Sequence, residues 1–86
     1  MSREILLLED EHDLRDLLAY LFESQGYEVV AVRTAEEALR RLRQKTPDII
    51  VLDVALPGMS GLEVCRRIPK PAPPTLILSA LDRDDQ

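Results

Sequence analysis

Short runs of apolar residues alternate along the chain with longer segments in which apolar residues recur every three or four positions. Unbroken runs occupy Ile5 to Leu8 and Ile49 to Leu52, and two further candidate strands span residues 27–32 and 75–78. Runs of this length with few polar interruptions are typical of strands that are covered on both faces, as in a parallel sheet. The pattern therefore predicts four strands.

Three helices are predicted between these strands. The first helix carries a single apolar stripe and stops at Gly26; the stripe consists of Leu14, Leu17, Leu18, Leu21 and Phe22. The other two helices begin at Thr34 and Ser60, each of which stands three residues before a glutamate, the spacing of a capping box. In the last helix we expect the inward side chains to be Leu62, Cys65 and Ile68.

Strands and helices alternate, so the sequence predicts an α/β domain with a parallel sheet and right-handed crossovers. Ligands of such sheets bind beyond the carboxyl ends of the strands. The residues at these ends are Asp10, Asp53 and Ser79. We therefore expect the chemistry of the protein near these three positions.

Composition and charge argue against several classes of protein, among them nucleic-acid-binding, membrane-bound and disulfide-linked ones. The 86 residues carry a net charge of −5, which disfavours direct binding to nucleic acid or to an anionic membrane. The first apolar run is too short for a signal peptide or a membrane span. The single cysteine, Cys65, excludes an internal disulfide and fits a reducing compartment. A cytoplasmic protein with one core is expected, with neither nucleic acid nor membrane as a partner.

Carboxylates follow two of the predicted strands. Glu9 and Asp10 come directly after the first strand, and Asp53 follows the third. Three carboxylates at one sheet edge repel one another unless a cation joins them, and Mg²⁺ suits such oxygen ligands. The alternative is that these acids are solvated loop residues, which are common.

Three segments at strand ends resemble the receiver domain of two-component response regulators. They are Ile5 to Glu11, Asp53 to Val64 and Leu78 to Ala80, and the resemblance extends over residues 3–84. It implies a flavodoxin-like, doubly wound parallel sheet with strand order 2-1-3-4. The family has five βα units, so residues 1–86 are expected to form a single truncated receiver domain that lacks the fourth helix, fifth strand and fifth helix.

The resemblance also implies a site. Asp53 would accept a phosphoryl group from a phosphohistidine on a sensor histidine kinase or a phosphotransfer protein. Mg²⁺ would be bound by Asp10, by a carboxylate oxygen of Asp53, by the backbone carbonyl of Ala55, and by Glu9 through water. Such a domain is a phosphotransfer substrate and switch rather than an enzyme.

Two further residues receive roles from the resemblance. The hydroxyl of Ser79 would contact the phosphoryl group and move during switching, and the small side chain of Ala80 would leave room for that group. The family also places a lysine at the end of its fifth strand. Lys70 is followed by proline as that lysine is, but it lies in a connector at the opposite edge of the sheet and is not expected to reach Asp53.

Two other functions are considered. A truncated receiver that no longer switches could serve as an interaction or assembly module, and an exposed fourth strand favours self-association or domain swapping. A phosphatase or flavin-binding protein of the same architecture is disfavoured, because Ala55 stands where a second aspartate would be needed and no glycine-rich phosphate loop follows the first strand.

Overall fold

The computed structural model describes residues 3–53 and 58–78, which form one four-stranded sheet with three helices. All strand pairs are parallel, and the order across the sheet is β2-β1-β3-β4. The strands are β1 (Glu4–Leu8), β2 (Glu28–Val32), β3 (Ile49–Asp53) and β4 (Thr75–Leu78). The predicted strands and their order are confirmed.

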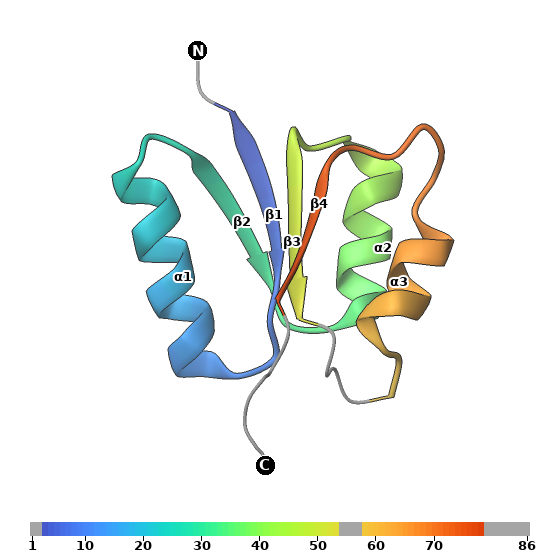
Figure 1. Ribbon diagram of the computed structural model, residues 1–86, viewed down its shortest axis with the longest axis horizontal. Coiled ribbons are helices and arrows are strands. Elements are labelled where there is room, and N and C mark those ends of the chain that lie inside the picture. Colours follow the sequence, from blue (N-terminus) through green and yellow to red (C-terminus); the bar gives the residue numbers. More distant parts are fainter. Residues whose placement is uncertain (1–2, 54–57, 79–86) are drawn as a thin grey trace.

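The helices cover the sheet from both sides (Figure 1). Helix α1 (His12–Ser24) lies on one face, and α2 (Ala35–Gln44) and α3 (Gly61–Arg67) lie on the other. The carboxyl ends of the strands all point toward the lower edge of the sheet in Figure 1. The architecture is therefore the doubly wound α/β arrangement that the sequence predicts.

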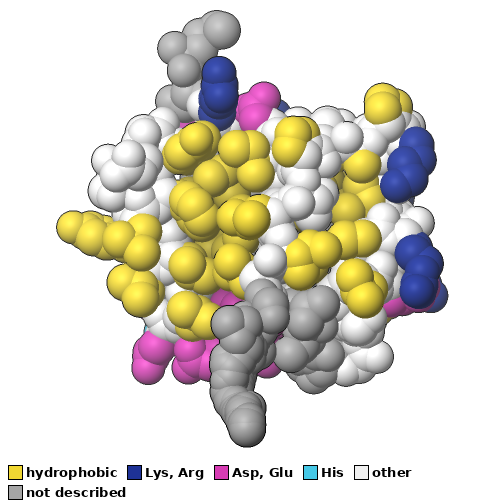
Figure 2. Space-filling model, in the orientation of Figure 1, with side chains coloured by type: hydrophobic (Ala, Val, Ile, Leu, Met, Phe, Trp, Pro, Cys, Tyr) yellow, Lys and Arg dark blue, Asp and Glu magenta, His cyan; other side chains and the backbone are white. Residues whose placement is uncertain are grey.

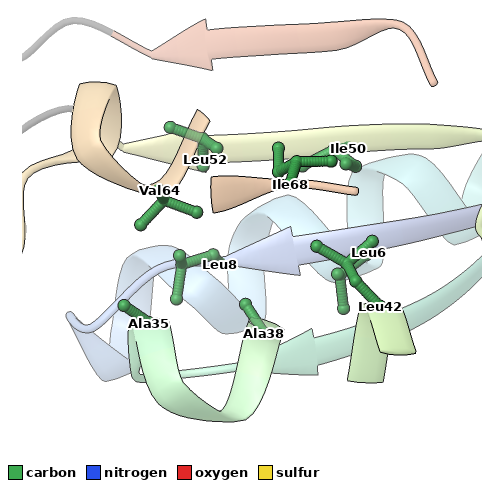
Figure 3. Packing of buried hydrophobic residues seen from close by; sticks show 9 residues of the cluster. All are labelled: Leu6, Leu8, Ala35, Ala38, Leu42, Ile50, Leu52, Val64 and Ile68. Atoms are coloured by element: carbon green, nitrogen blue, oxygen red, sulfur yellow. The ribbon is translucent and has the colours of Figure 1, made fainter. Parts of the chain in front are cut away.

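Alternation along β1 divides the core into two layers. Leu6 and Leu8 face α2 and α3, whereas Ile5 and Leu7 face α1. All four side chains are at most 1% exposed, so β1 is the buried centre of the sheet. Figure 3 shows the larger layer; its buried members are Leu6, Leu8, Ala35, Ala38, Leu42, Ile50, Leu52, Val64 and Ile68.

Thr34 and Ser60 both cap their helices as predicted, but the reciprocal bond of a capping box is missing at Ser60. The hydroxyl of Thr34 accepts from the backbone N–H of Glu37 at 3.1 Å, and Ser60 does the same for Glu63 at 3.2 Å. The return bond of a capping box is not made at Ser60, because the carboxylate of Glu63 binds Arg66 and Arg67 on the next turn. The ion pairs within α3 thus take the place of the bond between the Glu63 carboxylate and the backbone N–H of Ser60.

One inward side chain of α3 was predicted wrongly. Leu62 is 52% exposed, whereas Val64 is 1% exposed and packs in the core beside Ile68. The buried face of this short helix follows the spacing of Gly61, Val64 and Ile68, which places Leu62 at its flank. Cys65 packs against the same core as predicted, but only in part.

The apolar stripe of α1 is wider than the surface that it buries. Leu18 and Phe22 pack against the sheet, but Leu17 and Leu21 remain 53% and 47% exposed. On the same face, Leu76 of the edge strand β4 is 51% exposed and pairs in register with Val51. Figure 2 shows hydrophobic side chains gathered over this side of the molecule.

The connector between α3 and β4 enters the sheet at its amino end. Its last residue, Pro74, accepts from the backbone N–H of Ile50 at 2.9 Å. Lys70 is exposed in this connector. In Figure 1 the connector runs at the amino end of the sheet, opposite the carboxyl end of β3. The prediction that Lys70 stays away from the candidate site is consistent with this position. None of the helices in the described ranges has the length and apolar character needed to span a membrane.

We expect Leu52→Ala to lower the free energy of unfolding by about 2–5 kcal/mol, because this fully buried side chain leaves a cavity when truncated. Leu62→Ala is the matched control, since its exposed side chain should cost only about 0.5 kcal/mol. Urea denaturation of both variants tests the assignment of the buried face. Equal losses would contradict it.

Candidate phosphoacceptor and metal site

Strand pairing sets the position of the acidic residues. β1 and β3 are neighbours, and Leu8 pairs in register with Leu52. The next residues along the two strands are Glu9 and Asp53, which therefore lie at the same level of the sheet. Asp10 follows at the start of the turn into α1.

The three acids form one group at the carboxyl edge of the sheet. Each of Glu9, Asp10 and Asp53 offers a carboxylate oxygen, and these oxygens lie within 4.8 Å of one another. Glu9 is 1% exposed, Asp53 is partly buried and Asp10 is exposed. The group is thus open to solvent on one side and closed by the core on the other.

The turn after β1 is held by hydrogen bonds that start from Glu9. Its backbone N–H donates to the carbonyl of Val32 at 3.1 Å, which extends the sheet by one residue. Its Oε2 accepts from the backbone N–H of Glu11 at 3.1 Å. Its Oε1 is buried and meets no hydrogen-bond donor among the described residues. One oxygen of a nearly inaccessible carboxylate is thus left for a cation or a proton.

The surroundings of Glu9 favour its protonated form. Burial raises the pKa of this carboxyl above 4.5, and the negative charges of Asp53 and Asp10, with a hydrogen bond to Asp53, raise it further. The N–H of Glu11 acts in the opposite direction, but burial is the largest effect. Two carboxyls can share a hydrogen bond only if one carries a proton. A divalent cation would replace that proton and remove the repulsion.

These residues fit Mg²⁺ in chemistry and in number. Hard cations take oxygen ligands, and Mg²⁺ is commonly bound by one or two carboxylates plus water and phosphate oxygens. The sequence predicted that Glu9, Asp10 and Asp53 would come together, and the structure brings them together. Ala55, Ser79 and Ala80, to which the resemblance also gave roles, lie outside the described residues.

Two neighbours of the site were missed in the sequence. Glu11 caps α1, since its Oε1 accepts from the backbone N–H of Leu14 at 2.7 Å. Arg15 reaches back from α1 to the carbonyl oxygens of Glu9 and Asp10. The three-residue spacing from Glu11 to Leu14 could have indicated the cap. No spacing rule indicates the contacts of Arg15, because they depend on the rotamer of a long side chain.

His12 lies near the site but takes no part in the acidic group. Its Nδ1 lies 3.3 Å from Oδ1 of Asp13, and its Nε2 lies 3.6 Å from Oδ2 of Asp16. All three side chains are largely exposed. His12 therefore pairs with exposed carboxylates of its own helix rather than with the acidic group.

Comparison with known proteins decides the family. The model of the response regulator receiver domain matches residues 5–86, nearly the whole chain. The chain belongs to the response regulator receiver domain family. The resemblance inferred from the segments at the strand ends is thereby confirmed, and so is the flavodoxin-like class of the sheet.

Curated relatives of this receiver domain are transcriptional regulators. It is 41% identical over 86 residues to the alkaline phosphatase synthesis transcriptional regulatory protein PhoP of Bacillus subtilis, covering 98% of this chain and 36% of the relative. It is 44% identical over 68 residues to the phosphate regulon transcriptional regulatory protein PhoB of Rhizobium meliloti, covering 79% and 30%. The receiver domain thus spans about a third of the length of these relatives.

Solved structures share the fold. The response regulator TrrA of Thermotoga maritima, in complex with Mg²⁺-BeF, superposes with a TM-score of 0.85 at 34% identity, covering 92% of this chain and 70% of that one. The chemotaxis response regulator CheY4 of Vibrio cholerae gives 0.83 at 25% identity, covering 90% and 68%. The fold of the described strands and helices is thus that of receiver domains.

Burial of Glu9 predicts a pH dependence of stability without metal. A carboxyl whose pKa is raised by folding keeps its proton in the folded chain at pH values where the unfolded chain has lost it. Stability therefore falls as pH rises from about 4.5 through the raised pKa. We expect Glu9→Gln, which removes this ionisation, to gain stability relative to the parent over that range. Urea midpoints in chelator across the pH range provide the measurement, and a pH-independent difference would contradict the prediction.

Proposed function

We propose that this receiver domain accepts a phosphoryl group on Asp53 from a phosphohistidine of a sensor histidine kinase or phosphotransfer protein, and acts as a signalling switch. The domain would be a substrate for phosphotransfer rather than an enzyme. We place this reaction in the cytoplasm, where the single free thiol of Cys65 would stay reduced.

The observation that carries the proposal is the convergence of Glu9, Asp10 and Asp53 at the ends of two adjacent parallel strands. Asp53 is suited to be the nucleophile because it is only partly buried at the end of β3. Glu9 is nearly inaccessible, and its Oε2 is engaged by the N–H of Glu11. The three acids thus differ in access, with Glu9 buried, Asp53 partly buried and Asp10 exposed. Low access argues against Glu9 as the nucleophile, and the choice of Asp53 over Asp10 rests on the family resemblance.

The transfer itself is a simple displacement. One carboxylate oxygen of Asp53 forms a bond to phosphorus while the bond between phosphorus and the imidazole nitrogen of the donor breaks. The imidazole keeps the electron pair of the broken bond and takes up a proton. Such reactions need an in-line nucleophile and stabilisation of charge on the phosphoryl oxygens more than covalent participation by the protein.

Mg²⁺ would be held by Asp10 and Asp53, with Glu9 contributing through water and Ala55 through its carbonyl. When bound, it supplies positive charge that lets a phosphoryl group approach three carboxylates. Within the acidic group, Oε2 of Glu9 is engaged by the backbone N–H of Glu11, whereas its Oε1 meets no donor among the described residues and faces the place proposed for the ion and its water. The Mg²⁺-BeF complex of the related TrrA supports this part of the proposal.

The roles of Ser79 and Ala80 in the proposal rest on the family resemblance. Ser79 follows β4, the neighbour of β3, so its hydroxyl is assigned to a phosphoryl oxygen. Ala80 is assigned to leave room for the phosphoryl group. The proposal names a phosphohistidine partner by its chemistry, and the output under control in a longer protein would be set by sequences outside this domain.

Intact mass after incubation with acetyl phosphate and Mg²⁺ tests the acceptor. We expect one phosphoryl group on the parent, removal of that group by hydroxylamine as for an acyl phosphate, and no addition when Mg²⁺ is chelated. Asp53→Asn should prevent the addition. Asp16→Asn is the matched control, because this exposed aspartate of α1 pairs with His12 and lies outside the acidic group.

Two results would contradict the proposed acceptor. One is a phosphoryl group that survives in Asp53→Asn. The other is a parent that binds Mg²⁺ but stays unmodified. The second result would favour the alternative function of an assembly module.

The exposed leucines favour that second candidate function. Leu17, Leu21 and Leu76 lie on one face and are about half exposed, and β4 forms an edge of the sheet. Soluble monomers rarely expose contiguous apolar surface together with an unpaired strand edge. We propose self-association of two copies through β4, in which the edge strands pair and each leucine face is covered by the other copy.

Sedimentation equilibrium tests the self-association. The parent is expected to shift toward the dimer mass as its concentration rises through the micromolar range, and Leu76→Lys is expected to stay monomeric. Leu62→Lys is the matched control, because Leu62 is equally exposed but lies on α3. A parent that is monomeric at every concentration, or equal effects of the two variants, would contradict this function.

A further inference from the structure

Arg15 connects helix α1 to the turn that carries two of the acidic residues. Its Nη1 lies 3.0 Å from the carbonyl oxygen of Glu9 and 3.4 Å from that of Asp10. The side chain is partly buried, and it reaches back across five to six residues. The guanidinium therefore acts on the backbone of the residues whose side chains form the site.

The backbone of the turn after β1 is held in place by hydrogen bonds from two sides, and Arg15 provides those on the side of α1. The backbone N–H of Glu9 is bound to Val32 of β2, and its carbonyl oxygen is bound to Arg15. The two peptide units that flank the Cα of Glu9 are thus held by β2 and by α1. Rotation of either unit would move the side chain of Glu9 away from Asp53.

Arg15 donates to the backbone of the turn rather than to the side-chain carboxylates of Glu9 and Asp10. Both contacts of Nη1 are with carbonyl oxygens, those of Glu9 and Asp10. A salt bridge to one of these carboxylates would have competed with a cation instead.

We propose that Arg15 is a positioning residue for the cation site: it holds the Glu9–Asp10 backbone in the conformation that turns both carboxylates toward Asp53. The inference rests on the proposed binding of Mg²⁺. Residues that orient metal ligands from behind typically change metal affinity by about 10- to 100-fold when removed.

Calorimetric titration of the 86-residue chain with MgCl₂ tests the inference. Arg15→Ala is expected to weaken Mg²⁺ binding by about 10-fold or more. Arg15→Lys retains the charge and one donor group, so it should recover part of the affinity. Arg43→Ala is the matched control, because it removes the same charge from an exposed position on α2 and should bind Mg²⁺ as the parent does.

Urea denaturation in chelator separates positioning from folding. If Arg15→Ala does not fold, Arg15→Lys carries the test, and a folded lysine variant with the affinity of the parent would overturn the proposal. Equal affinity of folded Arg15→Ala and the parent would overturn it as well, as would an equal loss in Arg43→Ala. A parent that binds no Mg²⁺ would instead overturn the proposed metal site itself.

Discussion

Parallel pairing of β1 with β3 is the constraint on which the site depends. The register that places Leu8 beside Leu52 also places Glu9 beside Asp53, one residue further along each strand. Four parallel strands expose their carboxyl ends at one edge, so residues separated by more than forty positions in the sequence meet there. A shift of one residue in this register would turn one of the two carboxylates to the other face of the sheet.

Burial gives the acidic group its chemical character. Glu9 follows a strand whose central side chains are almost inaccessible, and it is itself buried, so its charge is costly without a cation. The same core that stabilises the sheet therefore disfavours the charged form of Glu9, and the carboxylates of the group repel one another unless a cation or a proton is present. Arg15 contacts this part of the chain through the backbone carbonyls of Glu9 and Asp10 rather than through their carboxylates.

Much of the fold follows from local pattern. The runs Ile5 to Leu8 and Ile49 to Leu52 are apolar because both faces of these strands are covered, and this feature is readable without a structure. The order of the strands needed the family resemblance, since alternation of strands and helices alone allows several orders. Leu62 was misassigned because a helix of seven residues has too few turns to define its buried face from periodicity.

The site was predictable to the extent that it uses strand ends. Glu9, Asp10 and Asp53 were found because parallel strands bring their carboxyl ends to one edge. Glu11 was missed although its three-residue spacing from Leu14 is that of an N-cap. Arg15 was missed because its contacts with backbone carbonyls depend on the rotamer of a long side chain, which the spacing of residue types does not encode. The exposure of Leu17 and Leu21 on α1 could not be predicted either, because periodicity shows which side chains share a face and not what covers that face.

A crystal structure of the chain grown with Mg²⁺ and beryllofluoride, a mimic of a phosphoryl group, tests the central claim most directly. The account predicts beryllium bonded to a carboxylate oxygen of Asp53, with Mg²⁺ beside it and ligated by Asp10. Beryllofluoride absent from Asp53 while Mg²⁺ occupies the acidic group, or an ion bound away from Glu9, Asp10 and Asp53, would contradict it.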